Sequence, residues 1–129
     1  MSELIGKIKS TIEKLDSGIQ ETPSHLNFSL LRDLRNYCRK QMFENDVSLN
    51  VAVCFFIEKF LEELITNFDI DALYTEKLNR ARIEMYNYFV ASLPQIEKAL
   101  ISKDQDSIIG IMGNVIQTYG EKISLLNKN

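Results

Sequence analysis

Apolar residues recur along the chain at spacings of three and four positions, and no stretch alternates long enough to predict a sheet. Over residues 2–19 the remaining positions are mostly Lys, Glu, Ser and Asp, so this segment predicts an amphipathic first helix. Gly18 and then Thr22-Pro23-Ser24 are expected to end it, because proline cannot continue the backbone hydrogen bonds of a helix. The apolar stripe of this helix consists of Leu4, Ile8, Ile12, Leu15 and Ile19, with Ile5 beside it.

A second helix is expected to begin near Pro23 or Asn27. At about 100° per residue its apolar side chains gather on one side and its arginines on the other. The polar segment Glu44-Asn45-Asp46 ends it, and Ser48 or Asp46 can cap a third helix. The apolar side consists of Leu30, Leu31, Leu34, Tyr37, Cys38 and Met42, and the arginines are Arg32, Arg35 and Arg39.

The third predicted helix, over residues 49–68, is the most hydrophobic of the chain. From Val51 to Ile57 every residue is apolar, so these side chains point in all directions around the helix axis. A helix of this kind must be surrounded by others. We therefore expect it at the centre of the fold.

A fourth helix follows, with Asp71 as its expected N-cap. One apolar stripe runs along its whole length, and a second one, made of Ile83, Tyr86 and Val90, appears in its C-terminal half. Two apolar sides require either another helix of the same chain or another subunit as cover. The first stripe consists of Tyr74, Leu78, Ala81, Met85, Tyr88 and Phe89.

Ser92-Leu93-Pro94-Gln95 matches a capping box, so the sequence predicts that a new short helix begins there and ends near Ser102. Asp104-Gln105-Asp106-Ser107 then supplies a turn and a cap for the last helix. In this helix Gly113 and Gly120 lie seven residues apart beside the apolar stripe, which favours close packing of a neighbouring helix over a hinge or a ligand groove. The stripe consists of Ile108, Met112, Val115, Ile116, Tyr119, Ile123 and Leu126.

Together these elements predict an all-α protein, a single-domain bundle of five to six helices over residues 1–129 around the hydrophobic helix at about 49–68. With 129 residues, 45% of them apolar and 26% charged, the chain is large enough to build a core without disulfides or metals. Two prolines and five glycines form no linker that would divide it.

The net charge of −3 argues against a general nucleic-acid binder. Cys38 and Cys54 match neither a zinc-ligand pair nor a CxxC redox motif, and we expect both to be reduced and buried. The N-terminal residues do not resemble a secretory signal, and no apolar run is long enough to cross a membrane. These features predict a cytoplasmic protein that does not bind membranes. We also expect a bacterial origin.

We expect no catalytic residues, no metal and no cofactor. His25 is the only histidine, which removes most catalytic triads and ordinary zinc sites, and no glycine-rich phosphate loop occurs. The pairs Asp69/Asp71 and Asp104/Asp106 lack the other positions of a calcium loop and are better explained as helix caps. Glu58 and Glu62 are one turn apart, where a solvated acidic face is favoured over a cation site.

The strongest surface signal is the cluster of Arg32, Arg35, Arg39 and Lys40. Three interpretations remain open. The first is a solvated face with local ion pairs to Asp33 or to the acidic residues of the third helix. The second is docking to an acidic protein partner, since arginine is frequent at binding hot spots. The third is contact with RNA or DNA.

Aromatic and methionine side chains offer a second signal, because they can line a cavity for an aromatic ligand as well as fill the core. Core filling is favoured, since any helical bundle needs such stripes. The residues concerned are Tyr37, Tyr74, Tyr86, Tyr88, Tyr119, Met85, Met112 and Phe89.

The leading functional hypothesis is a non-catalytic protein-interaction module, such as an adaptor, an inhibitor, an immunity protein or a small chaperone. We expect a homodimer or a stable complex with another protein through Ile83, Tyr86 and Val90. The alternative is a sensor domain that holds a small apolar or aromatic molecule between its helices. A third hypothesis is a nucleic-acid accessory protein that uses Arg32, Arg35 and Arg39.

Overall fold

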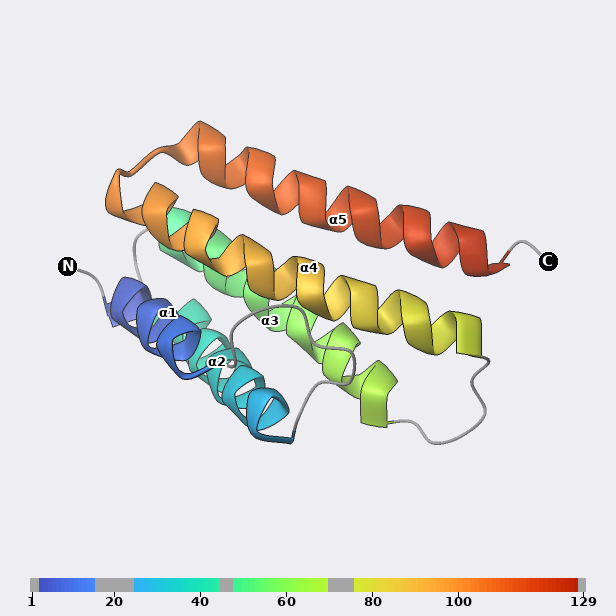
Figure 1. Cartoon of the computed structure of the whole chain (residues 1–129). Helices are drawn as coiled ribbons and strands as arrows, with labels where there is room; N and C mark the ends of the chain where they lie inside the picture. The colour runs from blue at the N-terminus through green and yellow to red at the C-terminus, as the bar shows by residue number, and fades with distance from the viewer. Residues whose placement is uncertain (1–2, 16–24, 45–47, 70–75, 128–129) are drawn as a thin grey trace.

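The computed structural model describes residues 3–15, 25–44, 48–69 and 76–127, and this part of the chain forms five α-helices and no strand (Figure 1). The predicted all-α class is therefore confirmed. The helices are α1 (Glu3–Lys14), α2 (His25–Glu44), α3 (Ser48–Asp69), α4 (Glu76–Ile101) and α5 (Gln105–Asn127).

The helices pack as a bundle in which α3 and α4 lie in the middle. The α3 helix contacts α2, α4 and α5, and α4 contacts α1, α3 and α5. Figure 1 shows α5 running antiparallel along α4, on the side of the bundle away from α1 and α2. The hydrophobic helix is thus central, as predicted, but α5 covers only part of the α3–α4 layer.

The core fills the space between α3, α4 and the inner faces of the other helices. Fully burying a side chain of this size stabilises the fold by about 1.5–3 kcal/mol. The largest fully buried side chains are Leu4, Ile8, Leu31, Leu34, Ile57, Leu61, Leu64, Tyr86, Phe89, Leu93, Ile96 and Ile108.

The first helix ends at Lys14, earlier than its apolar stripe predicts, and Leu15 lies in a bend. Leu15 still donates its backbone N–H to the carbonyl of Thr11 at 3.0 Å and keeps its side chain buried. Asp and Ser, which favour turns over helix interiors, are the next residues in the sequence. Low helix propensity therefore ends the helix where hydrophobic spacing alone predicts that it continues.

The predicted boundary at Ser92 is wrong, because α4 continues through it to Ile101 with Pro94 inside the helix. The hydroxyl of Ser92 donates to the carbonyl of Phe89 at 2.6 Å, which is the opposite of the accepting role of an N-cap. Pro94 removes one backbone donor. The fully buried Leu93 and Ile96 on either side of it continue the apolar stripe and hold the helix together. Side-chain burial therefore overrides the local signal.

The turn between α4 and α5 satisfies the free backbone groups of both helices. Lys103 adopts a positive φ of 56°, and its N–H donates to the carbonyl of Leu100 at 3.2 Å. The N–H of Asp104 donates to the carbonyl of Ala99 at 2.9 Å, which completes a Schellman motif.

Asp104 is also the N-cap of α5, as predicted. Its carboxylate accepts the backbone N–H of Ser107 at 3.1 Å and the hydroxyl of the same residue at 2.8 Å. These two hydrogen bonds, the backbone one first, lower the pKa of the Asp104 carboxyl below its usual value.

Several residues that carry sequence predictions lie outside the described part of the chain. They are Gly18, Ile19, Thr22, Pro23, Ser24, Asn45, Asp46, Asp71 and Tyr74, together with the side chains of His25, Asp69, Leu78, Ala81, Ile123 and Leu126.

Candidate functional site

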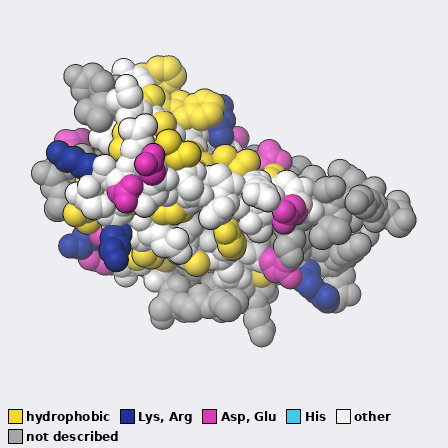
Figure 2. All heavy atoms as spheres, turned by 90° about the horizontal axis from the view of Figure 1, so that it is seen from above, with side chains coloured by type: hydrophobic (Ala, Val, Ile, Leu, Met, Phe, Trp, Pro, Cys, Tyr) yellow, Lys and Arg dark blue, Asp and Glu magenta, His cyan; other side chains and the backbone are white. Residues whose placement is uncertain are grey.

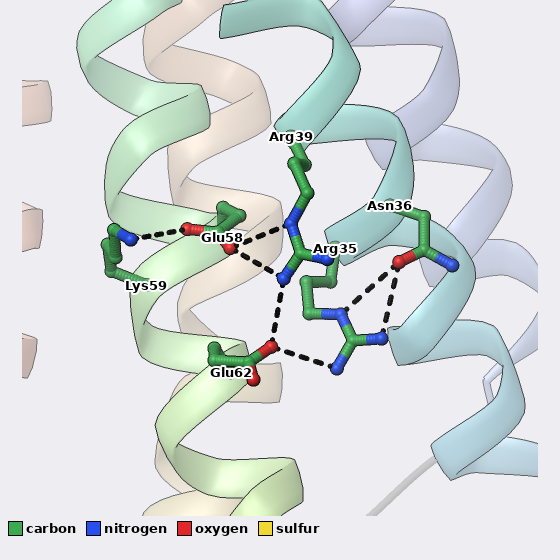
Figure 3. Close-up of polar contacts among 6 residues, drawn as sticks. All are labelled: Arg35, Asn36, Arg39, Glu58, Lys59 and Glu62. Carbon is green, nitrogen blue, oxygen red and sulfur yellow. Dashed lines mark hydrogen bonds and ion pairs between the residues drawn. The ribbon is translucent and has the colours of Figure 1, made fainter.

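The basic side of α2 meets the acidic side of α3 in a cluster of ion pairs (Figure 3). Arg39 donates from Nε and Nη2 to Glu58 Oε1 at 3.1 and 2.9 Å, and from Nη2 to Glu62 Oε2 at 3.0 Å. Arg35 donates from Nη1 to the same Glu62 oxygen at 3.1 Å. Two arginines of one helix thus bind two carboxylates that lie one turn apart on the next.

Glu58 is the buried member of this cluster. Its side chain is 4% exposed, whereas that of Arg39 is 48% exposed. Lys59 Nζ lies 3.5 Å from Glu58 Oε2, so both oxygens of the carboxylate face a cation. The pKa of Arg39 is raised, first of all by its hydrogen bonds to Glu58. A buried carboxylate needs such partners, because water cannot replace them.

The predicted basic surface is therefore only partly a free surface. Arg35 and Arg39 bind Glu58 and Glu62, which agrees with the first of the three interpretations and leaves their guanidinium groups less available for an acidic partner or for nucleic acid. The same contacts replace the solvated acidic face that we expected at these two glutamates. Arg32 is half-buried and Lys40 is exposed.

The two cysteines are buried and free, and their thiols are hydrogen-bonded to each other across α2 and α3. The pKa of Cys38 lies above its ordinary value because of this hydrogen bond and of burial. The neighbouring Tyr37 hydroxyl is buried and accepts or donates no hydrogen bond among the described residues. Burial, and after it the charge of Glu3, raises the pKa of Tyr37 to about 12. The two cysteines are thus free and buried, as expected from the sequence.

The second stripe of α4 is not the surface that the sequence predicts. Tyr86 is 1% exposed, and its ring packs against that of Phe28 on α2 at 5.6 Å between centroids. Ile83 and Val90 are half-buried. The sequence left open whether another helix of the chain or another subunit covers this stripe. At Tyr86 the cover is another helix of the same chain. This residue is not available to a partner.

The close helix packing predicted at Gly113 and Gly120 is not found within one copy of the chain, over the residues that the structure describes. Both residues are exposed, and a Cβ atom built at either position meets nothing within 4 Å in the described part of the chain. Gly110 is equally open. Each glycine costs about 1 kcal/mol relative to alanine in an exposed helix. Within one copy of the chain, no packing contact among the described residues offsets this cost.

An apolar groove of about 280 Å³, which sequence reasoning missed, lies between α3 and α5. Its floor is held in place by the core, because Phe60 stacks on Phe89 at 4.9 Å and meets the edge of Tyr119 at 5.4 Å. The Tyr119 hydroxyl donates to Glu63 Oε1 at 2.9 Å. The groove is lined by Phe55, Phe56, Lys59, Phe60 and Glu63 of α3 and by Ile116 and Tyr119 of α5.

Exposed apolar side chains continue from this groove across α5. Phe55 is 54% exposed on the α3 side, with Lys59 Nζ 5.7 Å from its ring centroid. Ile116 is 58% and Ile109 53% exposed on α5. Figure 2, which views the molecule from the α5 side, shows hydrophobic side chains at this surface. The expectation that Val51 to Ile57 are surrounded on all sides is thus wrong at Ala52 and Phe55, which are both exposed.

The aromatic and methionine residues considered for a ligand cavity are divided between three places. Met85, Tyr86 and Phe89 are buried in the core, and Tyr119 lines the groove. Tyr88 lines a smaller cavity of about 90 Å³ between α4 and α5, whose other walls include Ser92, Gln95 and Asn114. Neither of these two cavities collects them.

No group of three or more His, Cys, Asp or Glu side chains is arranged to hold a metal ion among the described residues. Within the same ranges, none of the helices is both long enough and apolar enough to cross a membrane. Comparison of the chain with protein-family models, with curated proteins and with solved structures finds no match. The candidate site therefore rests on the geometry of the groove and of the exposed face of α5.

Proposed function

We propose that the protein is a non-catalytic protein-interaction module that binds its partner through the groove between α3 and α5. The observation that carries the proposal is the exposure of Phe55 and Ile116, more than half of each side chain, on either side of this groove. Large apolar residues gathered at one place on a surface are typical of a binding site, whereas isolated ones are common on any protein.

The groove also has the composition of a binding hot spot. Aromatic side chains form its floor, and Lys59 and Glu63 provide polar groups at its edge. Its rigid aromatic floor lowers the entropy that is lost on binding, because the rings are already fixed by the core. A helix with an apolar face is a suitable partner for a surface of this shape.

The experiment that tests this function is native mass spectrometry of the tagged protein purified gently from its own host. We expect a protein partner at fixed stoichiometry in the wild type, and its loss in the Phe55→Glu/Ile116→Glu variant. Both side chains are more than half exposed, so the double substitution leaves the core intact.

Leu26→Glu is the matched control. Leu26 is 61% exposed on α2, which is not among the helices that form the groove, so this variant removes an equally exposed apolar side chain elsewhere. Retention of the partner by Leu26→Glu together with its loss from the groove variant supports the proposal. A partner retained by both variants, or lost from both, contradicts it.

A sensor domain for a small apolar or aromatic molecule is the second candidate function. The volume of the groove is close to the lower end of the range for small-molecule sites, about 300–1,000 Å³, and four of its lining residues are aromatic. The same mass spectra test this function. A mass increase of a few hundred daltons without a protein partner, abolished by Phe55→Glu/Ile116→Glu, favours the sensor.

A role in nucleic-acid binding is the least favoured of the three hypotheses. Arg35 and Arg39 are already bound to Glu58 and Glu62, and phosphate contacts need free cationic groups. The test is binding to RNA or DNA that weakens with salt and disappears when Arg32, Arg35 and Arg39 are changed to Glu.

A further inference from the structure

We propose that the partner of this surface is a second copy of the chain, packed antiparallel through α5 about a two-fold axis. In this arrangement each exposed isoleucine of one α5 lies over a glycine of the other. The inference rests on the proposed function and specifies its partner.

The face of α5 that carries the inference combines large and absent side chains in a regular order. At about 100° per residue Ile109, Gly113, Ile116 and Gly120 lie on one side of the helix. The two isoleucines are seven residues apart, as are the two glycines. All four are exposed, and no described residue comes within 4 Å of a Cβ atom built on either glycine. Along this face a projecting isoleucine side chain therefore alternates with the gap above a glycine. Both residue types repeat every seven residues, which is the heptad spacing of helices that pack side by side.

The order of these residues is self-complementary when a second α5 runs in the opposite direction. If Ile109 lies opposite Gly120 of the second copy, the same register places Gly113 opposite Ile116, because both pairs of residue numbers have the same sum. The two-fold axis then passes between residues 114 and 115, and every pair occurs twice. A two-fold dimer requires such a self-complementary surface. A partner of unrelated sequence does not require it.

Charge along α5 favours the antiparallel over the parallel orientation. Asp104 and Asp106 stand at the N-terminal end of α5, whereas the C-terminal part carries one charge of each sign, at Glu121 and Lys122. Antiparallel helices bring unlike ends together, and parallel helices bring the aspartates of both copies to one end. The exposed ring of Phe55, across the groove from Ile116, adds apolar surface beside the second helix.

Sedimentation equilibrium of the purified protein, over a wide range of concentration, is the first test. We expect a dimer in the wild type and at least a tenfold weaker dimer in Ile116→Glu, with unchanged helical circular dichroism. Leu26→Glu is the control and is expected to dimerise like the wild type. A wild type that is monomeric at all concentrations overturns the inference.

A pair of leucine variants distinguishes packing of isoleucine over glycine from general hydrophobic association. Gly113→Leu fills the space that Ile116 of the second copy would occupy, and Gly110→Leu adds the same side chain outside this face. A Cβ atom at either position meets nothing within 4 Å among the described residues, so we expect both variants to fold. We expect at least tenfold weaker dimerisation for Gly113→Leu and no such change for Gly110→Leu. Stronger dimerisation of Gly113→Leu contradicts the arrangement.

Disulfide cross-linking tests the register. The two copies of residue 113 are offset along the axis by about 4.5 Å, and those of residue 109 by about 16 Å. We expect Gly113→Cys to form a cross-linked dimer under mild oxidation, and Ile109→Cys to form one only when it is mixed with Gly120→Cys. The wild type is the control, since Cys38 and Cys54 are buried. Efficient cross-linking of Ile109→Cys alone indicates parallel helices and overturns the register.

Failure of this inference can be told apart from failure of the proposed function. The dimer is tested on the purified chain alone, and the function on protein from the host. If the purified chain is a monomer and the protein from the host binds a different protein, which the Phe55→Glu/Ile116→Glu variant no longer binds, only the dimer is disproved. The proposed function then stands. A monomer whose groove variant changes nothing in the host overturns both.

Discussion

At the residue scale, Lys103 adopts a backbone conformation that is unfavourable for lysine. Its positive φ of 56° is the left-handed conformation, which lysine adopts at a cost of about 1–2 kcal/mol and glycine adopts freely. We predict that Lys103→Gly raises the free energy of unfolding by up to about 1 kcal/mol, because the greater freedom of glycine in the unfolded chain offsets part of the gain.

Urea denaturation measures this change, and Lys98→Gly is the matched control. Lys98 lies in the last turns of α4, so glycine there lowers the free energy of unfolding by about 1 kcal/mol. A loss of stability in Lys103→Gly contradicts the assignment of the turn as a Schellman motif.

Tyr37 gives a prediction about alkaline pH. Its pKa is about 12 in the folded protein, against 10.0 for the unperturbed group, so folding favours the protonated hydroxyl. This contribution to stability is fully present below pH 10 and is lost as the pH rises towards 12. We predict that Tyr37→Phe is within about 1 kcal/mol of the wild type at neutral pH, because no hydrogen bond of the hydroxyl is lost.

The measurement for Tyr37 is urea denaturation at several pH values between 9 and 12. The variant is expected to lose less stability than the wild type over this range, although Cys38 contributes to the loss in both. Tyr88→Phe, at an exposed position, serves as the control and should follow the wild type. Parallel curves for the wild type and Tyr37→Phe would show that the hydroxyl titrates normally.

At the element scale, the α2–α3 pair depends on a cluster of ion pairs in which the two partners are unequally exposed. When Arg39 is removed, Glu58 stays in a position where water barely reaches it, whereas Arg39 without Glu58 still has water and Glu62. We therefore predict that Arg39→Ala destabilises the protein more than Glu58→Gln does, as measured by urea denaturation. Lys40→Ala, at an exposed position of the same helix, is the control. Equal losses for the two variants would mean that water enters the cluster.

Helix positions follow from the spacing of apolar residues wherever burial and local propensity agree. They agree in α2, and they disagree at Leu15, where weak helix formers follow, and at Ser92, where a capping signal lies within a continuous buried stripe. Local signals compete with tertiary burial, and one sequence does not show which is stronger. The cap at Asp104 was predictable because its signal coincides with the end of a stripe.

At the scale of the whole molecule, the candidate site was harder to predict than the fold. The spacing of the apolar residues in α3 and α5 predicts that both segments are helical. Only the packing of the helices in the structure shows that Phe55 and Ile116 face solvent. The reverse holds for Tyr86, which belongs to a stripe expected at a surface contact but is itself buried in the core. Burial depends on where the other helices lie, and periodicity within one helix does not contain this information.

The position of α5 on the outside of the bundle leads to a prediction about local stability. It packs on α4 with one face, leaves Ile109 and Ile116 exposed and contains three open glycines, so it makes fewer stabilising contacts than the central helices. Helices of this kind open at lower free energy than the core. In dilute solution we predict faster amide hydrogen exchange in α5 than in α3 and α4.

Amide exchange in α5 is expected to slow when the protein concentration is raised and to speed up when the pH is lowered. We predict that the proposed dimer slows exchange in α5 as the protein concentration rises, because the second copy covers the exposed face of this helix. Acid speeds the exchange: the lowered pKa of Asp104 stabilises α5 above the usual carboxyl range, and this contribution is lost as the pH falls through the lowered pKa. Asp104→Asn retains a capping side chain but removes the acid effect, after correction for intrinsic exchange rates. Exchange in α5 that is as slow as in α4 at low concentration would show that α5 is stable without a partner.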